Sequence, residues 1–221
     1  MTVYYQDALV TLYHGDCLDL ADKWTGADVL VTDPPYGMAY ISNHNTLSNA
    51  EKRARAVAGD ETVDVRDKAL KAWGDGPALV FGKWNCDRPS GVRHRLIWSK
   101  GDDPGMGDLG MPWGNSDEEV YVLGSGFVGK RGSNVITALK PPVNSRPNHP
   151  TPKPVALMER LLEKCPPGVV ADPFAGSGST LVAAVNQGRK VIGVEFEERY
   201  CELIANRLSN QTATLDFGGV S

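Results

Sequence analysis

A segment near the carboxyl end restricts the fold more than any other part of the chain. The apolar run Val169–Ala171 is followed by the glycine-rich turn Asp172–Gly178 and by a small apolar helical pattern over Ser179–Gln187. A second apolar run, Val191–Val194, leads into a helical pattern over Glu197–Leu208. Strand, glycine turn, helix, strand and helix in this order are typical of a right-handed βαβ unit of the nucleotide-binding kind. The segment therefore predicts an α/β fold with parallel strands.

Other apolar runs of strand length precede this unit. Most are continuous rather than alternating, as expected for strands that are buried on both faces of a sheet covered by helices. A helical stripe over Pro154–Lys164 has proline in its first turn and stops at Pro166-Pro167-Gly168. We therefore expect a Rossmann-like fold with a mostly parallel central sheet and helices on both faces. The further strands are predicted at Val29–Val31, Ala78–Phe81, Leu96–Trp98 and Val120–Leu123.

The remaining segments are expected to be loops or a tail within a single domain. Residues 37–68, with a short helix predicted at Glu51–Val57, and the glycine-rich residues 101–116 are expected to be irregular, and loops of this length are more often functional or mobile than structural. A frayed tail is predicted at Asn210–Ser221. With 221 residues, of which 41% are hydrophobic, the chain can bury one sizeable core. We expect a single domain, 1–221.

The glycine turn favours a ligand at the end of its strand. Gly176 and Gly178 allow backbone amides to approach a ligand where side chains would obstruct it. Glu195 follows Gly176 by 19 positions (195 − 176) and ends the next strand, where its carboxylate can accept hydrogen bonds from both ribose hydroxyls. The alternative is a turn that binds nothing. If a ligand binds, we expect it to be surrounded by Asp172, Phe174, Gly176, Gly178, Ser179, Thr180, Glu195 and Phe196.

Three ligands suit this geometry, and neighbouring residues distinguish them. A P-loop needs a lysine after its last glycine, whereas Gly178 is followed by Ser179 and Thr180. A dinucleotide pyrophosphate would meet the like charge of Asp172 immediately before the turn. S-adenosylmethionine carries a sulfonium and an ammonium, which the same carboxylate attracts. The turn therefore favours S-adenosylmethionine as the cofactor.

A second turn, Asp33-Pro34-Pro35-Tyr36, follows the first apolar run. Its simplest interpretation is a tight turn after a strand. Its groups also suit methyl transfer to an exocyclic amino nitrogen, which is a poor nucleophile because its lone pair is delocalised into the ring. The Asp33 carboxylate and the Pro34 carbonyl, whose direction the proline pair fixes, can accept the two amine hydrogens. Tyr36 can stack on the base, and the reaction then depends on positioning and electrostatics.

Several classes of site are excluded by residues that the chain lacks. The cysteines Cys17, Cys86, Cys165 and Cys201 contain no C-x-x-C pair, which argues against zinc and fits reduced thiols, so we expect no metal. Methylation at cytosine carbon 5 uses a Pro-Cys dipeptide, which is absent. An apolar stretch of about 18 residues and a signal-peptide pattern are also absent, so we expect a soluble protein of the cytoplasm.

Charge is distributed unevenly around a formal net value of −4, which does not by itself indicate a nucleic-acid binder. No Asp or Glu occurs between Glu119 and Glu159, and a basic run from Lys83 to Lys100 contains one acid, Asp87. Each run alone is explained by a solvated face. Because the two runs flank the two turns, we expect them to form a cleft that faces phosphates. The basic residues assigned to it are Lys83, Arg88, Arg93, Arg95, Lys100, Lys130, Arg131, Lys140 and Arg146.

The two turns in this order resemble those of the beta group of DNA amino-methyltransferases, in which the catalytic turn precedes the cofactor loop. His14–Leu18 is similar to the family's adenine-contacting segment, and His149–Pro154 to the segment that opens the next helix and touches the methionine carboxylate. Asn115–Tyr121 is similar to a segment lining the base pocket. The resemblance implies that the cofactor is also bound by Asp16, Cys17, Asp33, Thr151 and Lys153.

An aspartate at position 33 is shared by the adenine enzymes of this group, so the resemblance favours transfer to N6 of a flipped-out adenine in double-stranded DNA. It leaves open a homodimer and a partner endonuclease. It divides the chain into a catalytic half (1–123), a recognition segment (124–148) and a cofactor half (149–209). Because the recognition segment is short for this family, we expect recognition to be small or shared with residues 37–68.

Three alternatives remain open. The cytosine-N4 enzymes of the same group usually have serine where Asp33 stands. RNA and protein-glutamine methyltransferases use related turns, but their cofactor loop generally precedes the turn. A DNA-binding protein could retain the cofactor fold without turnover, and the intact Asp33 and Asp172 argue against this.

Overall fold

The computed structural model has the strand and helix alternation that the apolar pattern predicts. It describes residues 2–35, 63–102, 110–140, 147, 149 and 151–216, with side chains up to residue 211. In chain order the elements are β1 (Thr2–Gln6), β2 (Val10–His14), α1 (Ala21–Trp24), β3 (Val29–Thr32), α3 (Asp64–Trp73), β4 (Ala78–Gly82), β5 (His94–Ser99), β6 (Asp117–Leu123), β7 (Val135–Thr137), α4 (Val155–Leu162), β8 (Val170–Asp172), α5 (Ser179–Asn186), β9 (Val191–Glu195) and α6 (Glu198–Asp216).

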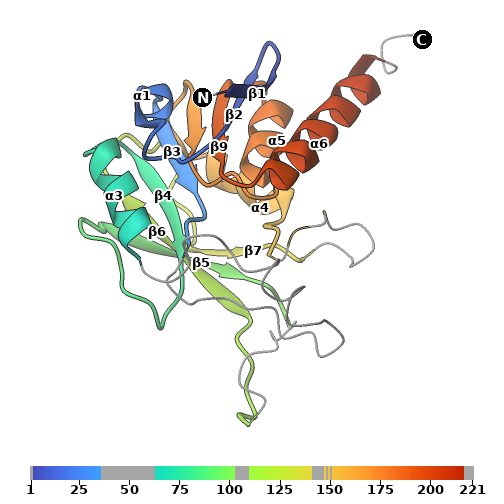
Figure 1. Ribbon diagram of the computed structural model, residues 1–221. Helices are drawn as coiled ribbons and strands as arrows, with labels where there is room; N and C mark the ends of the chain where they lie inside the picture. Colours follow the sequence, from blue (N-terminus) through green and yellow to red (C-terminus); the bar gives the residue numbers. More distant parts are fainter. Residues whose placement is uncertain are drawn as a thin grey trace.

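Within the described residues, nine strands form one sheet in the order β1-β2-β9-β8-β3-β4-β6-β5-β7 (Figure 1). Strands β2, β9, β8, β3 and β4 are parallel, whereas β6 is antiparallel to both β4 and β5. Strands β3 and β4 are buried along their whole length, as their continuous apolar sequences predict. The predicted mostly parallel α/β sheet is confirmed.

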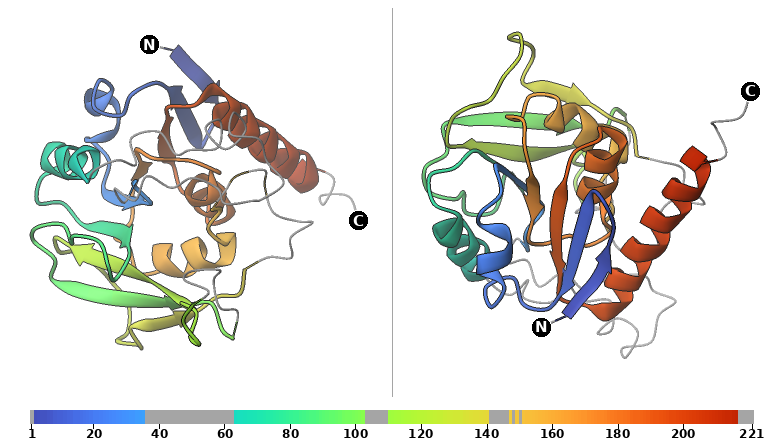
Figure 2. Two further views of the ribbon diagram at one scale, coloured as in Figure 1. Left: turned by 60° about the horizontal axis from the view of Figure 1, so that its bottom comes forward. Right: turned by 90° about the horizontal axis from the view of Figure 1, so that it is seen from above.

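Helices cover both faces of the sheet (Figure 2). On one face, α4, α5 and α6 contribute Leu161, Leu181 and Ile204 to the larger apolar core. On the other face, α1 and α3 contribute Trp24 and Trp73, whose rings stack with their centroids 6.3 Å apart. The sheet therefore lies between two layers of helices.

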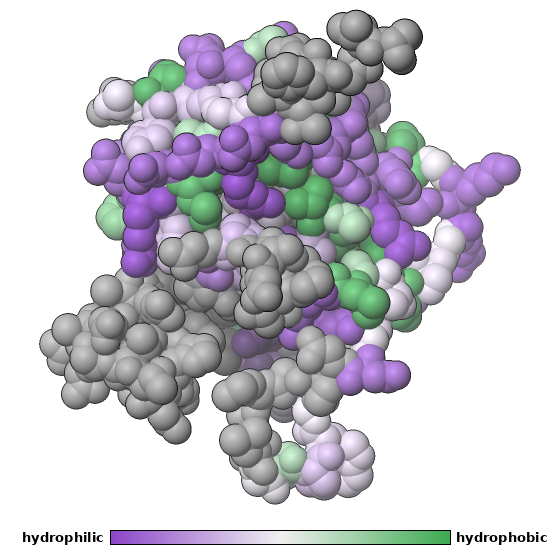
Figure 3. Space-filling view, turned by 90° about the vertical axis from the view of Figure 1, so that its right-hand side faces the viewer, coloured by the Kyte–Doolittle hydropathy of each residue, from purple (hydrophilic) through white to green (hydrophobic). Residues whose placement is uncertain are grey.

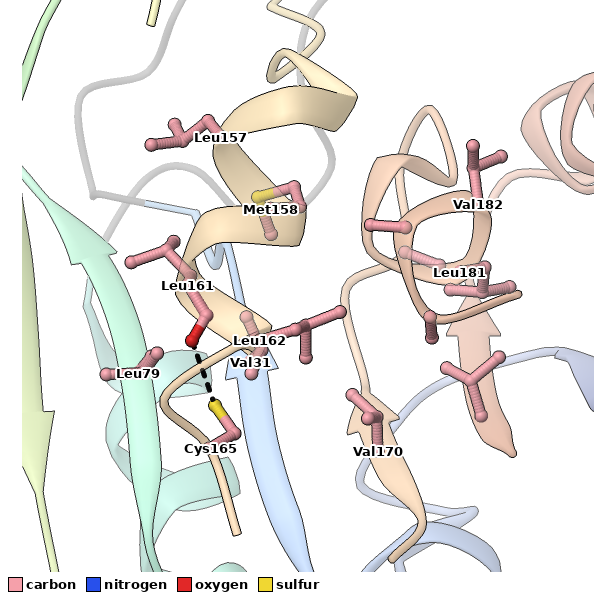
Figure 4. Packing of buried hydrophobic residues seen from close by; sticks show 14 of the residues in the cluster. Val31, Leu79, Leu157, Met158, Leu161, Leu162, Cys165, Val170, Leu181 and Val182 are labelled. Carbon is pink, nitrogen blue, oxygen red and sulfur yellow. Dashed lines mark hydrogen bonds between the residues drawn. The ribbon is translucent and has the colours of Figure 1, made fainter. Parts of the chain in front are cut away.

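Helix α4 forms for the reasons that its sequence suggests. Pro154, with φ −61° and ψ 132°, immediately precedes the first turn, where its missing N–H costs nothing. Leu161 and Leu162 are buried and share one cluster with Val31 of β3 and Leu181 of α5 (Figure 4). The helix therefore packs beside α5 on the same face of the sheet, and it positions the segment that precedes it.

Several elements differ from the sequence predictions. Strands β1, β2 and β7 were not predicted, because they are only partly buried and their sequences carry a weaker apolar signal than the central strands do. Helix α3 begins at Asp64, inside the segment 37–68 that we expected to be irregular. Helix α6 continues to Asp216, beyond Asn210, where the sequence pattern predicts that a frayed tail begins. The predicted helix Glu51–Val57 lies outside the described residues.

No helix among the described residues is long and apolar enough to cross a membrane. The face in Figure 3 is mainly hydrophilic, with a smaller apolar area between hydrophilic margins. Large exposed apolar side chains come from separate parts of the chain and include Trp84, Trp113 and Leu139.

The packing of α4 predicts the effect of Leu161→Ala, which should lower the free energy of unfolding by roughly 2 to 5 kcal/mol. Leu161 is 2% exposed in the core, so its removal leaves a cavity as well as losing buried apolar area. Leu139→Ala is the matched control, because Leu139 is 71% exposed and loses little on truncation. Urea denaturation measures both variants, and equal losses would contradict the assignment of α4 to the core.

Candidate functional site

The parallel strands bring distant residues together at one edge of the sheet. Because β2, β9, β8, β3 and β4 run in the same direction, their carboxyl ends lie along this edge. Strand β6 runs in the opposite direction, so its first residues also lie there. A cavity of about 390 Å³ opens at the edge. Among the predicted site residues, those that line it are Asp16, Cys17, Asp33, Pro34, Pro35, Lys83, Thr151, Lys153, Asp172, Phe174, Gly176, Ser179, Thr180, Glu195 and Phe196.

The glycine turn after β8 is tightly folded around one carboxylate. Gly178 has a φ of +77° and immediately precedes α5, and a Cβ there would lie 2.9 Å from Cγ1 of Ile204, so glycine is required. The Gly176 amide donates to Oε2 of Glu195 at 2.7 Å, and the Glu197 amide donates to Oε1 at 2.8 Å. Glu195 therefore connects the glycine turn to the loop after β9.

Two buried carboxyls at this edge are held in a medium that disfavours their charge. Burial raises the pKa of Asp172 to about 6, and the nearby charge of Asp33 adds to the increase. Burial also raises the pKa of Glu195 to about 7. Thr32 donates its hydroxyl to Oδ1 of Asp172 at 2.7 Å, and this bond joins the ends of β3 and β8. A cationic ligand in the cavity would favour the ionised form of both groups.

Asp33 is paired with a lysine that lies far from it in the sequence. Lys153 Nζ lies 2.5 Å from Oδ2 of Asp33 and 3.1 Å from Oε2 of Glu118. A second lysine, Lys100, lies 2.8 Å from Oε1 of Glu118. Lys100 is only 8% exposed, so its assignment to a phosphate-facing surface is wrong. The Lys153 ammonium points toward the catalytic turn, whereas the resemblance placed this lysine at the methionine carboxylate.

The segment after β2 closes another side of the cavity. The Gly15 amide donates to the Glu195 carbonyl at 3.0 Å, and the Leu18 amide donates to Oδ1 of Asp16 at 2.8 Å. Cys17 is buried, and burial raises the pKa of its thiol to about 12, so it is not a nucleophile at neutral pH. Phe196, which is 59% exposed, lines the same side.

Glu118, His149 and Tyr200 are among the lining residues that were missed as site residues from the sequence. The His149 and Tyr200 rings meet edge to face with centroids 4.6 Å apart. Burial lowers the pKa of His149 to about 4, and the charge of Lys153 adds to the decrease, so the imidazole is neutral at physiological pH. The segments around His149 and Glu118 had been identified by resemblance, but Tyr200 carried only the signal of a helical stripe.

The basic residues do not form one cleft. Lys83 follows β4 and lines the cavity, and Lys140 follows β7, which runs parallel to β5 toward the same edge. Arg93, Lys130 and Arg131 instead lie toward the opposite edge. The Arg93 guanidinium donates to the Gly124 carbonyl, beyond the end of β6, and the Lys130 carbonyl accepts from the lysine after α4. The expectation that all these residues line one cleft is therefore wrong.

Two further arginines are held by a single carboxylate. Arg95 and Arg88 approach Oε1 of Glu119 at 2.8 and 3.3 Å, and the Tyr121 hydroxyl donates to Oε2 at 2.6 Å. Glu119 is 2% exposed, whereas both arginine side chains are about half exposed. Their pairing reduces, but does not remove, their availability to a phosphate. Tyr36 and Arg146 lie outside the described residues.

The fold and the site define a class of protein: an α/β enzyme of the Rossmann type, with an acidic ligand pocket beside an Asp-Pro-Pro turn. Residues 50–207 match the N6/N4 DNA methylase family model, described as DNA methylase. The chain belongs to this family. The matched region includes the glycine turn and begins after the Asp33 turn.

Individual relatives agree with this assignment. The DNA adenine methyltransferase YhdJ of Escherichia coli (strain K12) is 44% identical over 245 aligned positions, covering 90% of this chain and 82% of that protein. The type II methyltransferase M.ScaI of Streptomyces caespitosus is 27% identical, covering 96% of this chain and 85% of that protein.

Solved structures share the fold. The M1.HpyAVI structure in complex with SAM has a TM-score of 0.63 and 21% identity, covering 90% of this chain and 99% of that chain. The PvuII DNA methyltransferase, which is cytosine-N4-specific, has a TM-score of 0.65 and 17% identity, covering 91% of this chain and 87% of that chain. At these identities the likeness establishes the Rossmann-like methyltransferase architecture alone.

Burial of Asp172 predicts that, without a ligand, Asp172→Asn raises the free energy of unfolding at pH 8 by roughly 1 to 3 kcal/mol. The pKa of Asp172 is raised to about 6 in the fold, from a usual value of about 3.9 in an unfolded chain. Such a carboxyl stabilises the fold at low pH and loses this contribution as pH rises from about 4 to about 6. Urea denaturation at pH 4 and pH 8 measures the change in the free energy of unfolding that Asp172→Asn causes at each pH.

The increase in the free energy of unfolding caused by Asp172→Asn should vanish at pH 4, where the Asp172 carboxyl of the parent protein is mostly protonated. Asp19→Asn, at an exposed aspartate, is the control and should change stability little at either pH. An equal effect of Asp172→Asn at both pH values would contradict the buried-charge explanation.

Proposed function

We propose that the chain transfers a methyl group from S-adenosylmethionine to the N6 amino nitrogen of adenine in DNA. The observation that carries the proposal is the contact between the two turns. Strands β3 and β8 are neighbours in the sheet, and Thr32, the residue before Asp33, donates to Asp172 at 2.7 Å. A turn suited to an exocyclic amine therefore lies directly beside a turn suited to a cationic donor.

The acidic side of the cavity fits S-adenosylmethionine, which supplies an electrophilic methyl group when bound. Asp172 offers a negative charge to its cationic groups, and the ionised carboxylate is favoured by such a partner. Glu195 already accepts two backbone amides, one through each oxygen. Each carboxylate oxygen has a second lone pair, so Glu195 can also accept ribose hydroxyls. The neutral His149 and Tyr200 complete the wall of this subsite.

On the other side of the cavity, the Asp33 turn acts on the target amine. The Asp33 carboxylate accepts one amine hydrogen and the Pro34 carbonyl accepts the second, which localises the lone pair on nitrogen. That lone pair forms the new nitrogen–carbon bond while the carbon–sulfur bond breaks and its electrons go to sulfur. The nitrogen then loses one proton, and Asp33 is the acceptor within reach. Positioning and electrostatics supply the rate enhancement.

Adenine is favoured over cytosine by the aspartate at position 33 and by the adenine methyltransferase of E. coli among the relatives. Cytosine N4 is the second candidate, because the PvuII enzyme shares the architecture. In either case a paired base must leave the duplex to reach a pocket at the edge of the sheet. Double-stranded DNA is therefore the substrate we assign.

Incubation of duplex DNA with labelled S-adenosylmethionine, followed by digestion to nucleosides and mass spectrometry, tests the proposal. We expect label in N6-methyladenine. Label in N4-methylcytosine would correct the base and keep the amine class. An unlabelled duplex, with labelled RNA or protein instead, would overturn the proposed substrate.

Asp33→Ala should reduce the single-turnover rate of DNA methylation by roughly 10²- to 10⁴-fold, the range for proton-accepting groups. Its affinity for S-adenosylmethionine, measured by calorimetry, should stay within a few-fold, because Asp33 acts on the amine rather than on the donor. Asp19→Ala, at an exposed aspartate, is the control. Full activity of Asp33→Ala would remove the catalytic assignment.

DNA affinity should fall with salt, and its slope should report which lysines meet phosphates. Lys83→Ala and Lys140→Ala, near the cavity edge, should each reduce the slope of log K against log salt by about 0.9 per lost contact. Arg131→Ala is the control at the opposite edge and should leave the slope unchanged. Fluorescence anisotropy at several salt concentrations gives these slopes, and a dominant effect of Arg131 would reverse the proposed DNA-binding face.

A further inference from the structure

A chain of alternating charges runs behind the catalytic turn in the order Lys100, Glu118, Lys153, Asp33. Adjacent members lie 2.8, 3.1 and 2.5 Å apart. The side chains are 10%, 14%, 7% and 24% exposed in the same order. Charges this poorly solvated are strongly coupled, and each one depends on its neighbour for compensation.

Lys153 occupies the centre of this chain and is fixed from several directions. Burial alone would lower the pKa of Lys153, but attraction to Asp33 and Glu118 raises it, so the ammonium keeps its charge. Its Nζ also lies 5.0 Å from the ring centroid of Phe81 on β4. Glu118 is held in turn by Lys100, and the two lysines lower the pKa of Glu118 despite its burial.

The backbone of Lys153 is tied to the other half of the site. Its carbonyl accepts the hydroxyl of Ser179 at 2.7 Å, and Ser179 is the first residue of α5, next to the glycine turn. Lys153 thus contacts the start of α5, next to the glycine turn, through its carbonyl, and it contacts Asp33 through its ammonium. This geometry sets the position of Asp33 relative to the glycine turn.

The surroundings of the ammonium argue against a main role in binding the donor's carboxylate. Two carboxylates already lie within ion-pair distance of it. A third would add repulsion from Asp33 and Glu118 in a poorly solvated site. Buried ion pairs contribute little net stability relative to apolar residues, so stability alone is a weak explanation for this one.

We propose that Lys153, clamped by Glu118, is a positioning residue that holds the Asp33 carboxylate in the orientation needed to accept a hydrogen of the target amine. This rests on the proposed methyl transfer to an amine. The bond to Oδ2 of Asp33 restricts rotation of the carboxylate, and the positive charge favours its ionised, accepting form. Lys153 acts through Asp33 and does not itself touch the reacting atoms.

Lys153→Met is the decisive variant, because it keeps the length of the side chain and removes its charge. We expect the single-turnover rate at saturating S-adenosylmethionine to fall by roughly 10²-fold, the scale for misplacing a reacting group by about 1 Å. The dissociation constant for S-adenosylmethionine, measured by calorimetry, should change by no more than about threefold, because the donor contacts remain. Lys153→Arg should recover part of the rate, because it restores the charge.

Two controls separate positioning from a general loss of structure. Lys190→Met removes an exposed lysine just before β9, at the sheet edge opposite the cavity, and should keep the parent rate. In an Asp33→Asn background, Lys153→Met should cost little further rate, because both changes affect the same carboxylate. If Lys153→Met lowered the rate as much in the Asp33→Asn background as in the parent protein, the proposal would be overturned.

Two results would assign Lys153 differently. Weaker donor binding with an unchanged rate at saturation would make it a donor-binding residue, and parent-like behaviour in both measurements would leave it without a role. If Lys153→Met does not fold, Glu118→Gln replaces it and should slow transfer about 10-fold at unchanged donor affinity. An unchanged rate in Glu118→Gln would then contradict the clamp. Failure of the proposed function can be told apart from failure of the positioning role, because in that case the parent protein itself would not methylate DNA.

Discussion

The parallel pairing of β2, β9, β8, β3 and β4 is the constraint on which the site depends. Each strand ends at the same edge, so residues that follow different strands share one cavity. The hydrogen bond from Thr32 to Asp172 then fixes the spacing between two of these ends. Neither turn could carry out the proposed reaction alone, since an amine and a methyl donor must meet within bonding distance.

Much of the fold could be predicted, because its central strands are buried on both faces and therefore have continuous apolar sequences. Val29–Val31 and Ala78–Phe81 are examples, and both lie within fully buried strands. The outer strands gave no such signal. Thr2–Gln6 is exposed or half-buried throughout, and Val135–Thr137 is short and mostly exposed. Their pairing is decided by the neighbouring strand and not by their own composition.

The site was predictable where function is encoded locally, as in the turn after β8 and the acid that ends β9. It was not predictable where function depends on register. Lys153 meets Asp33 across 120 positions, and Glu118 reaches both lysines only because β6 starts at the cavity edge. The direction of β6 also explains why the acid-free stretch between Glu119 and Glu159 does not form one surface. Strand β6 carries the chain from the cavity edge to the opposite edge of the sheet, where Lys130 lies.

Asp172 and Glu195 have a consequence for the protein in the cell. Burial makes their ionised forms costly at neutral pH, so without a compensating cation the site weakens the fold as a whole. A ligand that removes this cost stabilises the entire chain in proportion to its free concentration. When such a ligand is scarce, a larger fraction of molecules is unfolded and exposed to proteases. The abundance of the enzyme would then follow the supply of its methyl donor through folding stability.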